Sequence, residues 1–113
     1  MFRTDLWVAA FVRRHNDLGH ICVIARRGDP LAGQIFVEVD HLNGTVSLYT
    51  PAPSVLRGES ADRLFELRFD HVEADKVRDR IAREHDFDPD LWVISLELRN
   101  GDVGIEVVGA SRA

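Results

Sequence analysis

Two pairs of adjacent arginines are the residues of this sequence best suited to binding chemistry. Arg13 and Arg14 end an apolar run, and Arg26 and Arg27 open the stretch RRGDPLAG, in which Asp29 follows. A planar guanidinium binds carboxylates and phosphates through two parallel hydrogen bonds, which an ammonium cannot do. If the first helix packs beside the first hairpin, these four arginines could converge with Arg57 into an anion-binding patch. Asp29 is a further candidate for the anion-binding or partner-binding surface. Salt bridges to acids of the same chain are the alternative interpretation.

The stretch RRGDPLAG also has the composition of a tight turn between two strands. Asp29 suits the first turn position, Pro30 fixes φ at the next, and Gly33 is expected to supply the positive φ that closes a hairpin. This interpretation leaves Arg26 and Arg27 without a backbone role. In a continuing strand their side chains point to opposite faces of the sheet, so one ligand would meet only one of them.

Three Asp–His neighbours, at positions 40–41, 70–71 and 85–86, raise the question of acid–base catalysis. Neighbours on a strand point to opposite faces, and neighbours on a helix do not face each other. A catalytic dyad needs hydrogen-bond contact, usually between residues distant in sequence. The motifs of nucleotide-binding loops, serine hydrolases and zinc peptidases are absent from the sequence. We therefore predict no catalytic residue and no cofactor.

The sequence also argues against a metal site. Asp86, Asp88 and Asp90 have the spacing of a calcium loop, but Leu91 stands where that loop needs glycine. Cys22 is the single cysteine, so neither an internal disulfide nor a cysteine-based zinc site can form. Its apolar neighbours predict a buried, unreactive thiol.

Length and charge narrow the class of protein. The 113 residues suit one globular domain, residues 1–113. The net charge of −5 argues against nucleic-acid binding, which usually needs a basic surplus. The apolar run at 6–12 is too short to span a membrane and lacks the pattern of a signal peptide. We expect a cytoplasmic protein that contacts neither membrane nor nucleic acid.

Two segments have helical spacing. The first is predicted to begin at Thr4 or Asp5, either of which could cap it, and to end before Gly19. The second is predicted to begin at 70–73, where DHVE resembles a capping box, and to continue to about His85.

Six segments have the composition of short strands, and Asn43–Gly44 and Asn100–Gly101 are strong hairpin signals. This pattern predicts the α+β class, with a mostly antiparallel sheet of about five to six short strands in hairpins and a meander, and with two helices packed on one face. The predicted strands are 20–27, 34–40, 45–50, 63–69, 91–99 and 103–108.

Four stretches carry a resemblance that covers about Asp5 to Arg99. LWVAAFVRR, VIARRGDPLAG, LNGTVSLYTPAP and REHDFDPDLWVISLE occur in this order. In them the chain resembles a small bacterial, mainly alphaproteobacterial family, domain-of-unknown-function family 1491. The resemblance implies a bacterial cytoplasmic protein and supplies no activity, cofactor or residue role.

The favoured hypothesis is a non-enzymatic binding or protein-interaction domain. Its surface would be the arginine-bearing side of the first hairpin together with residues 51–62, and Trp7 or Trp92 would anchor a partner if exposed.

Two alternatives stay open. One is a small enzyme or an anionic-ligand-binding protein, with a pocket lined by Arg26, Arg27, Asp29 and a histidine. The other is a structural homodimer that pairs through an edge strand such as 103–108, because unpaired strand edges invite such pairing.

Overall fold

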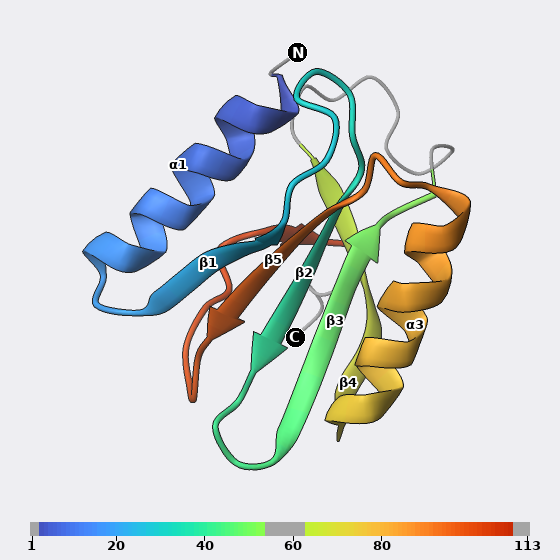
Figure 1. The fold of residues 1–113 in the computed structure, drawn as a ribbon. Coiled ribbons are helices and arrows are strands. Elements are labelled where there is room, and N and C mark those ends of the chain that lie inside the picture. The colour runs from blue at the N-terminus through green and yellow to red at the C-terminus, as the bar shows by residue number, and fades with distance from the viewer. Residues whose placement is uncertain (1–2, 54–62, 110–113) are drawn as a thin grey trace.

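Two helices and a six-stranded sheet make up the computed structural model, which describes residues 3–53 and 63–109 (Figure 1). The candidate loop at 51–62 therefore lies largely outside the described residues. In chain order the elements are α1 (Thr4–Asp17), β1 (Ile21–Arg26), β2 (Ile35–Asp40), β3 (Thr45–Pro51), β4 (Leu64–Glu73), α3 (Ala74–Phe87), β5 (Trp92–Glu97) and β6 (Glu106–Val107).

The sheet is mixed, with strand order β1-β5-β2-β3-β4-β6. The pairs β1–β5, β2–β3 and β3–β4 are antiparallel, whereas β2–β5 and β4–β6 are parallel. The α+β class is confirmed, but the mostly antiparallel sheet is a wrong prediction. Since β5 lies between β1 and β2, the first three strands form no meander, and RRGDPLAG is not the turn of a hairpin.

One predicted hairpin is present and the other is not. Asn43–Gly44 joins the paired strands β2 and β3. Asn100–Gly101 does follow β5, but the chain then crosses to β6, which pairs with β4. Contacts with α1 explain the crossing: Val103 and Ile105 pack against the α1-side core, and Arg14 donates to the Gly104 carbonyl at 2.9 Å.

The two helices cover opposite faces of the sheet, which corrects the expectation that both pack on one face. On β2, Ile35 and Val37 belong to the core that Phe11 of α1 completes. Phe36, between them, belongs to a second core with Val77 of α3. Because alternate residues of a strand point to opposite faces, an apolar residue at every one of these positions needs cover on both sides.

The first helix forms as predicted, but its start is held differently. The Thr4 side chain is buried and makes no cap hydrogen bond to the helix. Its hydroxyl donates to the Gly33 carbonyl at 3.0 Å and accepts from the Arg63 guanidinium at 2.6 Å. Thr4 therefore attaches the helix to the segment before β2.

The predicted capping box at 70–73 is wrong, because these residues end strand β4 and α3 begins at Ala74. Val72 and Glu73 are paired with Val46 and Thr45 of β3. Pairing with a neighbouring strand supplies the backbone partners that a helix start would otherwise have to find within its own first turn.

RRGDPLAG wraps around the residues that precede and begin β5. The Asp29 N–H donates to the Asp90 carbonyl at 3.0 Å, and the Asp29 carbonyl accepts from the Trp92 indole N–H at 2.8 Å. The Asp29 carboxylate accepts from the Leu31 and Ala32 amides at 3.1 and 2.8 Å, as predicted for a turn residue. One aspartate thus fixes both the shape of the loop and its position.

The two glycines of this loop are required by close packing. A Cβ on Gly28 would lie 2.0 Å from the Asp90 carbonyl oxygen, and a Cβ on Gly33 would lie 2.5 Å from the same atom. Both also face the Trp92 ring. Gly33 has no positive φ, so its predicted role in closing a hairpin is wrong. A glycine is needed at this position because a larger side chain would clash with the Asp90 carbonyl.

The exposed edge of β1 is partly covered by a side chain of α1. The Asn16 amide donates to the Cys22 carbonyl at 3.2 Å and accepts from the Cys22 N–H at 3.1 Å. Asn16 thus takes the place of a neighbouring strand at this residue. A covered edge opposes pairing with another chain.

We predict that Gly28→Ala destabilises the protein by about 2–3 kcal/mol, because the added methyl group displaces the start of β5. Urea unfolding measures the change. Ala32→Ser, at an exposed position of the same loop, should leave the unfolding midpoint unchanged. A Gly28→Ala variant as stable as the wild type would contradict the close packing described here.

A candidate binding groove beside α3

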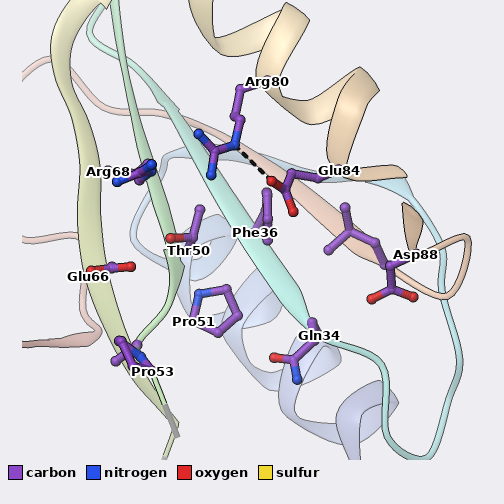
Figure 2. A pocket seen from close by; sticks show the side chains of 12 residues that line it. Gln34, Phe36, Thr50, Pro51, Pro53, Glu66, Arg68, Arg80, Glu84 and Asp88 are labelled. Carbon is purple, nitrogen blue, oxygen red and sulfur yellow. Dashed lines mark hydrogen bonds and ion pairs between the residues drawn. The ribbon is translucent and has the colours of Figure 1, made fainter. Parts of the chain in front are cut away.

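A hollow of about 460 Å³ lies between α3 and the sheet (Figure 2). We call it the α3 groove. Its size falls within the range of small-molecule sites, roughly 300–1,000 Å³. The residues that line it are Gln34, Phe36, Thr50, Pro51, Ala52, Pro53, Glu66, Arg68, Arg80, Glu84, Asp88 and Leu91.

The floor of the α3 groove is formed largely by buried apolar residues. Phe36 and Leu91 are buried members of the α3-side core. Thr50 and Ala52 are buried as well, at the end of β3 and just beyond it. A ligand in the groove would therefore rest on hydrocarbon.

Charged side chains reach the groove from two sides (Figure 2). From α3, Arg80 donates to the Glu84 carboxylate at 2.9 Å, an i,i+4 pair. From β4 come Glu66 and Arg68, which share a face because they are two residues apart. Arg68 has no hydrogen bond or ion pair to the described part of the chain. Its guanidinium can therefore accept an anionic group without breaking an existing contact.

Gln34 lines the groove, but its acceptor atom is covered by other atoms of the protein. Its Oε1 atom is buried and receives no hydrogen bond from the described residues. A buried acceptor without a donor costs about 1–3 kcal/mol, and such groups are uncommon in folded proteins. A ligand N–H donor in the groove could remove this cost only after rotation of the Gln34 side chain.

The arginines predicted from sequence do not converge. Asp5, at the start of α1, donates its amide to the Pro30 carbonyl at 2.9 Å, so the start of the helix meets the loop that follows Arg27. Arg13 and Arg14 lie in the last half of the same helix. The two arginine pairs are thus near opposite ends of α1, and none of these side chains lines the α3 groove.

Each of the predicted residues near β1 has a partner within the chain. Arg26 donates to Nε2 of His85 at 3.1 Å, and Arg27 lies over the Trp92 ring at 5.0 Å, a cation–π contact. Asp29 holds the loop as described above. Trp92 itself is 1% exposed, so it is not available to anchor a partner.

One of the three Asp–His pairs is in hydrogen-bond contact, although sequence neighbours were expected to point apart. Asp70 and His71 are in contact at 2.6 Å, because His71 has a positive φ of 53° that departs from strand geometry. The His71 ring also stacks on that of His41, with centroids 3.6 Å apart. His41 follows β2, whereas His71 lies in β4, so the sequence carried no signal for this pair.

Ser47 joins this histidine pair but is not placed as a nucleophile. A hydrogen bond of 2.8 Å links its hydroxyl to Nε2 of His41, and the hydroxyl also accepts from the His71 N–H at 3.0 Å. Ser47 is 1% exposed. A substrate could not reach the hydroxyl, so the cluster holds β3, β4 and the 41–44 turn together.

Burial changes the acidity of several side chains. It raises the pKa of the Cys22 thiol to about 11, consistent with the predicted inert cysteine. It lowers the pKa of His41, which the neighbouring His71 lowers further. It also lowers the pKa of His15, whose Nε2 donates to the Val103 carbonyl at 2.6 Å. We expect both histidines to be neutral in the folded protein at pH 7.

Two negative findings concern the described residues. Across 3–53 and 63–109, His, Cys, Asp and Glu side chains form no group of three or more suited to a metal ion. In the same ranges neither helix has the length and apolar character needed to span a membrane.

Comparison with known proteins places the chain in a family. Residues 2–106 match the family described as "Protein of unknown function (DUF1491)". The chain belongs to the DUF1491 family. No curated protein matches the sequence.

Solved structures of DUF1491 relatives share the fold. A crystal structure of a DUF1491 family protein from Caulobacter crescentus is 30% identical, covers 94% of this chain and 96% of its own, and has a TM-score of 0.77. The solution structure of Atu0922 from A. tumefaciens is also 30% identical, covers 98% of both chains and has a TM-score of 0.84. Both organisms are alphaproteobacteria, as the resemblance implied.

The α3 groove could not be found from sequence. Glu66 and Arg68 on one strand face, and Arg80 and Glu84 one helical turn apart, are visible signals. Nothing in the sequence indicated that the two pairs line the same hollow, because this depends on strand order. The described lining contains no histidine or cysteine, so it differs from the pocket predicted around Arg26.

We predict that the free energy of unfolding falls as the pH is lowered below about 6.5. The pKa of His41 in the folded protein lies below its ordinary value of 6.5, so between the two values the unfolded chain binds more protons and is favoured. His15 acts in the same direction. Glu38 acts in the opposite direction, because burial raises its pKa.

A variant isolates the histidine effect. Urea unfolding of the wild type and of His41→Asn between pH 7.5 and 5.5 should show a smaller pH slope for the variant. Equal slopes would show that the protonation of His41 does not influence folding.

Proposed function

We propose that this protein is a non-enzymatic binding domain, and that the α3 groove holds a small ligand with a carboxylate and an N–H donor on an apolar body. The observation that carries this proposal is Arg68, which lines the open hollow and has no hydrogen bond or ion pair to the described residues. A ligand N–H group would donate to the carboxylates of Glu66 and Asp88, which line the same hollow.

The other walls of the groove support the same ligand class. Arg68 is available for a carboxylate, and charge-assisted hydrogen bonds of this kind contribute roughly 1.5–3 kcal/mol. Glu66 and Asp88 lie on the same lining and favour a cationic amine. Phe36 and Leu91 supply the apolar contact. These features fit a zwitterion such as a free amino acid better than a simple anion.

The lining supports binding rather than covalent catalysis. Thr50 is the one hydroxyl side chain among its described residues, and it is 6% exposed. A covalent mechanism needs a nucleophile in contact with a base. The hypothesis of an arginine-lined pocket for an anionic group is retained here in its non-enzymatic form, with Arg68 in place of Arg26 and Arg27.

We predict that L-leucine shifts the amide NMR signals of Gln34, Phe36 and Thr50 in the ¹⁵N-labelled protein. Leucinamide, which lacks the carboxylate, and 4-methylpentanoate, which lacks the amine, should each bind at least about tenfold more weakly, a difference of about 1.4 kcal/mol. The same loss is expected for L-leucine with Arg68→Met.

Arg13→Met is the matched control, since Arg13 is exposed on α1, away from the groove. It should leave the titration unchanged. No shift at the groove residues with any of the three probes, or equal weakening by both substitutions, would refute the proposed site.

A further inference from the structure

A second surface lies on the same side of the sheet as α3, next to the strands on which that helix packs. It consists of two rows across β1, β5 and β2, and we call it the β1–β5–β2 face. The register pairs Val23 with Ser95 and Ser95 with Glu38 in one row, and Ile21 with Glu97 and Glu97 with Asp40 in the other.

The β1–β5–β2 face is only partly covered by the described part of the chain: Ile21 and Val23 are exposed, whereas its polar residues, Glu38, Asp40, Ser95 and Glu97, are half-buried. These residues share a face with Phe36, because Glu38 and Asp40 follow it at two-residue intervals on β2. The helix on that side, α3, packs on β3 and β4 (Figure 1). The sheet therefore continues past α3, and this face is most exposed at its β1 edge.

The edge of this face is apolar. Ile21 is 60% exposed and Val23 is 51% exposed, side by side on β1. Leu42, 42% exposed, joins Ile21 and Glu97 in lining a hollow of about 430 Å³ at the end of the strands. Contiguous exposed aliphatic side chains mark interaction surfaces more often than single ones do.

The centre of the face is acidic. Glu38, Asp40 and Glu97 form no ion pair within the described residues. The Glu38 carboxylate accepts a hydrogen bond from Ser95, yet burial and the nearby Asp40 raise its pKa, while the attraction of Arg78 on α3 is the smallest contribution. A cation placed over this row would relieve the repulsion.

We propose that the β1–β5–β2 face docks a basic amphipathic helix of a partner protein. The helix lies beside α3, with apolar side chains on Ile21, Val23 and Leu42 and with lysine or arginine over the three carboxylates. A helix is favoured over an added strand because Asn16 covers the edge of β1 at Cys22. This inference is independent of the α3 groove.

The test uses two synthetic peptides of 18 residues. One has leucine at helical i, i+3, i+4 and i+7 spacing with lysine elsewhere, and the other has glutamate in place of lysine. The lysine peptide should shift the amide signals of Val23, Ser95 and Glu97. The triple variant Glu38→Gln, Asp40→Asn, Glu97→Gln should weaken its binding at least tenfold.

A charge-matched control separates this face from the overall negative charge. The triple variant Asp17→Asn, Asp79→Asn, Asp86→Asn removes three exposed acids from the helices and should change affinity less than twofold. Equal weakening by both triple variants, binding of the glutamate peptide, or shifts confined to the α3 groove would overturn the proposal.

Self-association is the remaining outcome. The outer side of α1 carries Ala9, Ala10, Arg13 and Leu18, and a second copy could present it to the face. A mass above 12.8 kDa without peptide, returned to the monomer by Arg13→Glu, would make a second copy the occupant and overturn the partner helix.

Discussion

The chain between β1 and β2 has to pass around a strand that lies between them, and the fold depends on how it does so. Asp29 binds the Asp90 carbonyl and the Trp92 indole, and the two glycines beside it leave room for that approach. The carbonyls of Pro30 and Gly33 in turn accept hydrogen bonds from the first turn of α1, from the Asp5 N–H and the Thr4 hydroxyl. One short loop thus fixes β5 in the sheet and the first helix on it.

The position of β5 also decides which surfaces are free. Because β5 lies beside β2, Ser95 of β5 is the neighbour of Glu38, and Val23 of β1 is the neighbour of Ser95 on the other side. The helix α3 covers only the β3–β4 side of this face. Both candidate surfaces lie on this face of the sheet, the α3 groove against α3 and the β1–β5–β2 face beyond it.

The candidate arginines show how residue type alone can mislead. A guanidinium is suited to anions, but Arg26 and Arg27 have His85 and Trp92 as partners within the chain, and Arg14 has the Gly104 carbonyl. Arg68 was not predicted as a binding residue, because in the sequence it stands as a single arginine between two apolar residues of a strand. Within the described residues the fold gives its guanidinium no ion pair or hydrogen bond and places it at an open groove.

The sequence by itself determined the helical and extended segments, the hairpin at Asn43–Gly44, the buried cysteine and the family. These properties follow from residues within a few positions of one another, where periodicity, turn preferences and short motifs act. Strand order, the opposite faces of the two helices and the groove were decided by the tertiary structure. The hydrogen bond between Trp92 and Asp29 joins residues 63 positions apart, and contacts of that kind leave no periodic trace in the residues between them.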